Sequence, residues 1–235
     1  MGVGAPSRPA KAMRSGFWRE NALSMVLLIL FASCLFGQIA SGRAVFNQER
    51  REHGLAPVAW IDYFHHGQFV SATFENWESE FLQMGLYVLL TVGLRQKGSA
   101  ESRPLDDKAQ GALEADSRDV EAGPSPSAVR RGGWIARLYA NSLSISLLLL
   151  FAVAFAAHGY GSWRQEVEER SIQGQAAPTL PEHLAGAEFW FESFQNWQSE
   201  FLAVLALVVL SIWLRQAHSP QSKPVRAPHS QTGAG

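Results

Sequence analysis

The sequence predicts an all-α fold: an integral membrane bundle of four transmembrane helices, arranged as two tandem parallel two-helix repeats. Two long apolar blocks contain no charged residue, and a shorter apolar block follows each of them. The second half of the chain also repeats the first, in the register that pairs residue 21 with residue 141. We call this alignment the repeat register.

The composition favours a membrane protein and excludes several other classes. The 235 residues include 20 Lys and Arg against 21 Asp and Glu, a net charge of -1. This near balance provides no basic face, so no nucleic-acid partner is predicted. Charged residues make up 17% of the chain, below the roughly 25% of soluble domains. The single cysteine, Cys34, excludes a disulfide framework and a thiolate cage for a metal.

The two long apolar blocks predict the first and third spans, over residues 22–40 and 141–157. At about 1.5 Å per residue, the first block is roughly 28 Å long, which suits a hydrocarbon core of about 30 Å. A secretory leader is an alternative for this block, with Arg14 and Arg19 as its basic start. The internal copy of the block disfavours that alternative, because a cleavable leader has no reason to be repeated.

The two shorter blocks, residues 81–94 and 201–214, predict the second and fourth spans. Their length alone also fits a buried core helix. The words TFENWESE and SFQNWQSE precede them, and including these words gives spans over residues 73–94 and 194–214. Arg95 and Arg215 then mark matching inner ends. Re-entrant or interfacial helices remain the alternative.

The repeat sets the predicted domain organisation. The motif N-W-x-S-E-F-L occurs at residues 76–82 and again at 196–202, and Gly54, which ends a predicted amphipathic helix, pairs with Gly174. Each repeat holds two spans, so both copies have the same orientation in the membrane. The predicted segments are an N-terminal tail (1–17), repeat 1 (18–104), a disordered linker (105–137), repeat 2 (138–224) and a C-terminal tail (225–235).

The distribution of basic residues predicts the orientation. The two loops between paired spans contain only five of the 20 basic residues: Arg43, Arg50, Arg51, Arg164 and Arg170. The positive-inside rule therefore places both termini and the linker in the cytoplasm, and these two loops outside. The predicted location is the bacterial inner (cytoplasmic) membrane.

A polar stripe on the second span gives a candidate intramembrane site. On a helix, Asn76, Glu80, Gln83, Tyr87 and Thr91 fall within an arc of roughly 80°. Part of this stripe recurs on the fourth span. The candidate site residues are Asn76, Glu80, Gln83, Tyr87, Asn196 and Glu200. They fit a proton or cation pathway, in which Glu80 and Glu200 share a proton. They also fit a structural role, in which they form hydrogen bonds that hold the helices together. The structural role is favoured because the stripe is incomplete in the second copy.

No metal site, cofactor or catalytic residue is predicted. Asp62, His65 and His66 lie together in the first outer loop, but their partners in the repeat register are Glu182, Ala185 and Gly186, so the cluster is not repeated, and no third ligand is assured. The chain has no Gly-rich phosphate loop, G-x-S-x-G elbow or H-E-x-x-H motif, so an enzyme is not expected.

The words FENWESEFLQMGLYVLLTVGLRQKGSAESRP and FWFESFQNWQSEFLAVLALVVLSIWLRQAHSPQSKP resemble an uncharacterised family of bacterial integral membrane proteins, a domain of unknown function. The resemblance covers nearly the whole chain outside the tails and the linker. It implies a bacterial membrane protein of about this length, with no activity, substrate or catalytic residue to carry over.

The predicted function is that of a non-enzymatic structural or interaction protein of the inner membrane. Its partner is the lipid bilayer, and a homo-oligomer is one possible assembly through its small-residue faces. A protein partner is not predicted. The alternative is a small proton or cation channel or transporter that uses Glu80 and Glu200.

Overall fold

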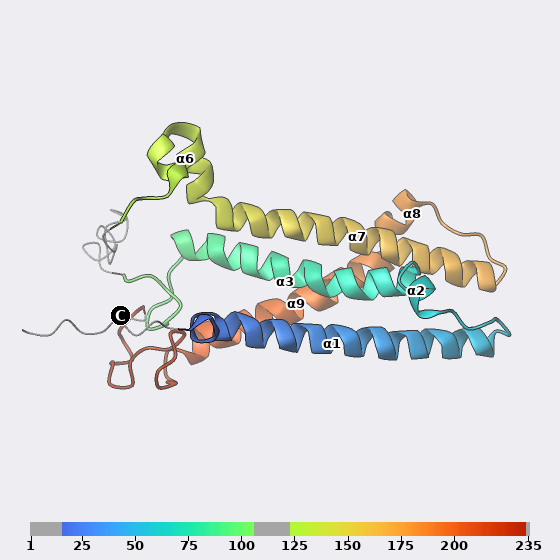
Figure 1. The fold of residues 1–235 in the computed structure, drawn as a ribbon, viewed down its shortest axis with the longest axis horizontal. Helices are drawn as coiled ribbons and strands as arrows, with labels where there is room; N and C mark the ends of the chain where they lie inside the picture. Colours follow the sequence, from blue (N-terminus) through green and yellow to red (C-terminus); the bar gives the residue numbers. More distant parts are fainter. Residues whose placement is uncertain (1–15, 106–122, 234–235) are drawn as a thin grey trace, which may run out of the picture. The chain divides into compact units, whose positions relative to one another are not determined.

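A computed structural model describes residues 16–105 and 123–233 (Figure 1). Within these ranges the chain forms eight helices and no strand. It divides into two compact units, the first ending at Trp60 and the second beginning at Ile61.

The first unit is built on one long helix, α1 (Phe17–Glu52). The helix continues well past the predicted span and ends just before Gly54, whose φ of +72° suits a residue without a side chain. The chain then returns along the end of α1. Arg43 and Asn47 donate hydrogen bonds to the carbonyl of Val58, at 2.7 and 3.3 Å, and the Arg43 guanidinium lies 4.6 Å from the centre of the Trp60 ring.

The second unit contains three long helices: α3 (Gly67–Gly93), α7 (Ser142–Ile172) and α9 (Ala187–Leu210). The short helix α2 (Trp60–Tyr63) lies at the division between the units, and α8 (Leu180–Ala185) joins α7 to α9. Helices α3 and α7 run side by side in opposite directions, and α3 also packs against α9 (Figure 1). We call the end of this unit where α7 finishes and α9 begins the α8 end.

At the α8 end the backbones of α3 and α7 touch. A Cβ atom added to Gly67 would lie 2.1 Å from the backbone nitrogen of Gln165. A Cβ atom added to Gly161 would lie 2.5 Å from the backbone nitrogen of Ser71. Only glycine permits this approach, which brings the polar side chains of the two helices into direct contact.

Two helices, α1 over Glu20–Glu52 and α7 over Ser142–Ile172, are long and apolar enough to cross a membrane. The second unit also has the reverse of a water-soluble pattern. Its fully buried side chains include Glu78, His158 and Ser193, while Leu149 and Leu202 are more than 60% exposed. Buried polar groups and exposed apolar ones are expected where lipid surrounds a helix bundle.

Equivalent features recur in the repeat register. Helices α1 and α7 end at Glu52 and Ile172, and α3 and α9 begin at Gly67 and Ala187. The loops that follow α3 and α9 also repeat a hydrogen bond. The backbone nitrogen of Gln96 donates to Ser102 Oγ at 2.9 Å, and that of Gln216 donates to Ser222 Oγ at 2.9 Å.

Part of the predicted disordered linker is helical. Residues 106–122 of the linker lie outside the described residues. Further along, α5 (Ser127–Arg131) lies within the linker, and α6 (Gly133–Ala140), with the sequence GWIARLYA, begins in it and ends just beyond it. Residues 225–233 of the C-terminal tail form turns.

The turns of the tail close over the buried side chain of Lys223. Its ammonium donates to the carbonyls of Gly98, His229 and Gln231, the last two at 3.1 and 2.9 Å. Burial lowers the pKa of Lys223, and the nearby positive charge of Arg215 lowers it further. An ammonium paired only with carbonyl dipoles therefore holds the tail against the loop that follows α3.

Candidate functional site

The structure separates the acids of the predicted site from the interior of the second unit. Glu80 and Asn76 are exposed on α3, and the Asn76 side chain donates to the carbonyl of Ala72 at 2.8 Å. Glu200 on α9 is half-buried and interacts electrostatically with Glu80. The structure therefore places these two carboxylates within electrostatic range of one another, at the surface of the helix pair.

The other predicted residues take different positions. Gln83 is buried, and the half-buried Tyr87 donates its hydroxyl hydrogen to Glu101 at 3.0 Å. Asn196 donates its amide hydrogens to the carboxylate of Glu75 and to the carbonyl of Glu192. Asn196 thus joins α9 to α3, while Tyr87 joins α3 to its own following loop.

The fully buried acid of α3 is Glu78, which is 0% exposed. One carboxylate oxygen accepts a hydrogen bond from the indole nitrogen of Trp197 on α9, at 3.1 Å. The other lies 3.0 Å from Nδ1 of His158 on α7. A buried carboxylate costs several kcal/mol unless it is paired, and here both oxygens have a partner.

His158 is the centre of the cluster and is itself 0% exposed. Its Nε2 lies 3.5 Å from the carboxylate of Glu192 on α9, too far for a regular hydrogen bond, and its ring packs against Phe189 with centroids 5.1 Å apart. Glu75 on α3 interacts electrostatically with this imidazole. One histidine thus faces acids from two helices.

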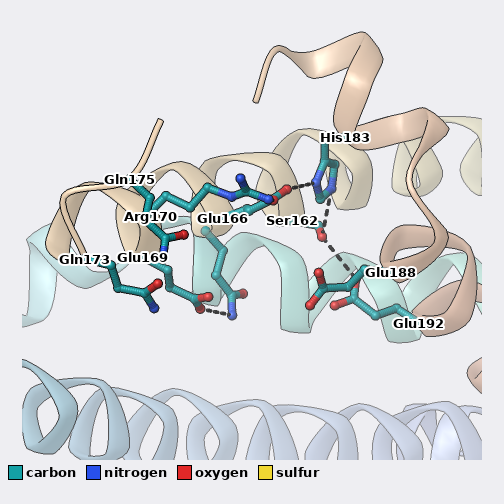
Figure 2. Close-up of a pocket in the computed structure, with 10 residues that line it drawn as sticks. Ser162, Glu166, Glu169, Arg170, Gln173, Gln175, His183, Glu188 and Glu192 are labelled. Carbon is teal, nitrogen blue, oxygen red and sulfur yellow. Dashed lines mark hydrogen bonds and ion pairs between the residues drawn. The ribbon is translucent and has the colours of Figure 1, made fainter. Parts of the chain in front are cut away.

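A chain of polar contacts continues from Glu192 toward the surface (Figure 2). The hydroxyl of Ser162 on α7 donates to Glu192 at 3.0 Å and lies 3.1 Å from Nε2 of His183 on α8. Nδ1 of His183 lies 2.5 Å from the carboxylate of Glu166, which also pairs with Arg170 at 2.5 Å. We call the series from Glu166 through His183, Ser162, Glu192 and His158 to Glu78 the relay.

The outer end of the relay lines a polar pocket of about 220 Å³ at the α8 end (Figure 2). Its lining includes four carboxylates and one guanidinium, so the pocket carries an excess of negative charge. The lining residues are Ser162, Gln165, Glu166, Glu169, Arg170, Gln173, Gln175, His183, Glu188 and Glu192.

The sequence positions these groups through helix geometry. His158, Ser162 and Glu166 are spaced four residues apart on α7 and therefore share one face. Helix α8 presents His183 because its first turn is fixed by Glu182, whose carboxylate accepts hydrogen bonds from the backbone nitrogen and hydroxyl of Thr179 at 2.7 and 2.8 Å. These two hydrogen bonds lower the pKa of Glu182.

The imidazole of His183 lies between two polar partners. The hydroxyl of Ser162 donates to Glu192 and lies within hydrogen-bond distance of Nε2 of His183, and Nδ1 of His183 lies beside the carboxylate of Glu166. Either ring nitrogen of an imidazole can carry the hydrogen, so His183 has a polar partner on each side with which it can exchange one.

The repeat does not identify the relay residues, because they are not conserved between its two copies. In the repeat register, His158 pairs with Gln38, His183 with Tyr63, Glu166 with Phe46 and Glu192 with Ala72, while Glu78 pairs with Gln198. The signal available in the sequence was the four-residue spacing of polar side chains on α7.

The two histidines between α2 and α3 have other partners. Nδ1 of His66 lies 2.9 Å from the carboxylate of Glu168, and Nδ1 of His65 lies 3.1 Å from the carbonyl of Ile61. Across the ranges 16–105 and 123–233, no group of three or more His, Cys, Asp or Glu side chains is placed to hold a metal ion.

Comparison with known proteins identifies the family alone. No curated protein and no solved structure matches the chain. The family model described as a domain of unknown function (DUF6766) matches residues 14–234. The chain therefore belongs to the DUF6766 family.

Proposed function

We propose that this chain is a non-enzymatic, four-span protein of the bacterial inner membrane that takes up protons from the outer side through the relay. The spans are α1, α3, α7 and α9, arranged as two tandem parallel repeats with both termini in the cytoplasm. In this arrangement the α8 end faces outward. Helices α5 and α6 and the tail around Lys223 face the cytoplasm.

Several observations support the membrane topology. Helices α1 and α7 have the length and composition of spans, and the second unit buries polar side chains while exposing apolar ones. The matching ends of the long helices in the repeat register support two tandem copies. The excess of Lys and Arg outside the loops between paired spans supports the orientation.

The continuity of the relay is the observation that carries the proposal of proton uptake. A fully buried imidazole and carboxylate lie in series with Glu192, Ser162 and His183, which reach a polar pocket. Every step is within hydrogen-bond distance except the one from Glu192 to Nε2 of His158, where the two groups lie 3.5 Å apart. Each member gives and accepts protons or hydrogen bonds, and ionisable groups at membrane depth are typical of proton pathways.

The order of transfer follows from the contacts. A proton that reaches Glu166 from the pocket passes to Nδ1 of His183, whose Nε2 releases a proton to Ser162. Ser162 passes its own hydrogen to Glu192. Glu192 then protonates Nε2 of His158, and Nδ1 of His158 gives a proton to Glu78. Each side chain between the pocket and Glu78 gives up one proton for the one it gains, so the relay delivers one proton to Glu78, and the proposal includes its release from there toward the cytoplasm.

A structural role is the second candidate, since bonds of the same cluster join three helices. Trp197 and Asn196 on α9 each reach a carboxylate of α3, and His158 joins α7 to both helices. These contacts alone would hold the bundle together. The link from Ser162 to His183 and the pocket adds little to that task, and it favours proton transfer.

The test is proton flux in proteoliposomes, measured with an enclosed pH-sensitive dye. We expect Glu78→Gln and His183→Gln to abolish flux, and the control Glu80→Gln to retain it, because Glu80 lies outside the relay. Each variant is first shown to have the circular dichroism and tryptophan emission of the unaltered protein. Flux that survives in folded Glu78→Gln, or no flux in the unaltered protein, would refute the proposal and leave the structural role. Loss of flux in Glu80→Gln with retention in Glu78→Gln would instead place the pathway at Glu80 and Glu200.

A further inference from the structure

We infer that α5 and α6 form a binding surface for anionic phospholipid headgroups at the start of α7. This inference rests on the membrane topology proposed above and not on the relay. Three features of residues 127–140 carry it: their charge, their exposed aromatic and apolar side chains, and the direction in which α6 leaves α7.

All the charged residues of this segment are arginines. Arg130, Arg131 and Arg137 are all exposed, and none makes an ion pair or a side-chain hydrogen bond within the described part of the chain. No Asp or Glu occurs from residue 122 through residue 165. Three unpaired guanidinium groups with no carboxylate nearby in the sequence complement a surface of phosphate groups.

The same segment exposes large apolar side chains. Trp134 is 72% exposed, and Leu138, one helical turn further on, is 49% exposed. These two share one face of α6, and Arg137 flanks them. Helices that lie in the membrane interface combine such a face with arginines, and tryptophan prefers the level of the headgroups.

The backbone places this face beside the start of the span. Helix α6 ends at Ala140; the next residue, Asn141, leaves helical geometry with φ -112° and ψ 8°, and α7 begins at Ser142. Helix α6 leaves the line of α7 at this point (Figure 1). The two glycines before α6, Gly132 and Gly133, both have positive φ and return α5 onto α6. If α7 crosses the bilayer, α6 runs along the cytoplasmic surface.

The occupant is therefore a lipid headgroup that carries a net negative charge, of the phosphatidylglycerol type. Each arginine near an anionic surface contributes about fivefold in affinity. Removing three should therefore weaken the attraction by about a hundredfold.

The test uses the full-length chain in nanodiscs made from phosphatidylcholine with increasing fractions of phosphatidylglycerol that carries brominated acyl chains. Bromine quenches nearby tryptophan, and the chain has 8 of them, so the share due to Trp134 is the difference between the unaltered protein and Trp134→Phe. We expect this share to rise with the phosphatidylglycerol fraction. The triple variant Arg130→Gln, Arg131→Gln, Arg137→Gln should shift the curve to higher fractions.

The matched control removes three other exposed positive charges, with Arg51→Gln, Lys97→Gln and Arg226→Gln. An unchanged curve in the control supports a local surface. An equal shift in both triple variants would show general attraction and overturn the inference. No quenching of Trp134 at any fraction would also overturn it, as would no shift in the first triple variant. Failure of the relay would leave all these results unchanged, because none of the substituted residues belongs to it.

Discussion

Replacing Glu78 with leucine tests whether the buried acid of α3 supports the fold. The substitution keeps the size of the side chain but removes the carboxylate. It leaves the indole nitrogen of Trp197 and Nδ1 of His158 buried without their partner. The control is Glu80→Leu, the same substitution two residues further along the same helix, at an exposed position.

The expected loss follows from the two contacts of Glu78. A hydrogen bond to a charged group contributes about 1.5–3 kcal/mol, so two of them amount to about 3–6 kcal/mol. Breaking a buried ion pair by removing one partner costs about 3–5 kcal/mol. Polar groups of an unfolded chain in a membrane also find partners, which favours the lower end. We expect Glu78→Leu to lower the free energy of unfolding by about 3 kcal/mol, and Glu80→Leu to change it by less than about 0.5 kcal/mol.

The measurement is reversible unfolding in mixed micelles with increasing sodium dodecyl sulfate, followed by circular dichroism. A double variant with Trp197→Phe isolates one of the two contacts. Its loss should be smaller than the sum of the two single losses, since both single variants remove the same hydrogen bond. The reasoning is refuted if Glu80→Leu destabilises the protein as much as Glu78→Leu, or if the losses of Glu78→Leu and Trp197→Phe simply add.

Three further changes have defined outcomes. Gly161→Val should lower the stability measured in the same micelles by about 1–3 kcal/mol, because it forces the touching backbones of α3 and α7 apart; Gly37→Ala, which has open space around it, should not destabilise. The lowered pKa of Glu182 stabilises α8 fully above its ordinary value near 4.5, and this contribution disappears as pH falls through the lowered value. The protection of the α8 amides, measured as their exchange rate relative to an unstructured peptide at the same pH, should therefore fall in acid, and in Glu182→Gln it should be low at all pH values; a fall in acid that persists in that variant would contradict the assignment. Lys223→Met should release residues 225–233 to limited proteolysis, whereas cleavage that matches the exposed control Lys97→Met would show that the carbonyl contacts do not hold the tail.

Much of the helical architecture could be predicted from the sequence. Long uncharged apolar blocks predict α1 and α7, because this property can be recognised without knowing which residues the helices contact. Gly54 and Gly174 mark helix ends because a positive φ is a local requirement. Helices α3 and α9 begin at Gly67 and Ala187, before the starts of the predicted spans at residues 73 and 194.

The candidate site could not be predicted in the same way. Helical periodicity identifies which residues share a face, but it does not identify which polar residue meets a partner on another helix. Glu78 and Glu80 stand two positions apart in one motif, and only contact with His158, 80 residues away, distinguishes them. The close approach at Gly161 fixes that contact, and its cause lies in the packing of two backbones.

The contact between α3 and α7 at Gly67 and Gly161 also has a consequence for access. Where the two backbones touch, no solvent molecule or lipid chain fits between them, so the cluster is closed on the side where α3 meets α7. The pocket residues, by contrast, come from α7, the segment that follows it, α8 and α9, with none from α3. Among the described residues, those of the pocket therefore lie on the side of the buried imidazole away from α3, next to the short turn at Gly186 that joins α8 to α9.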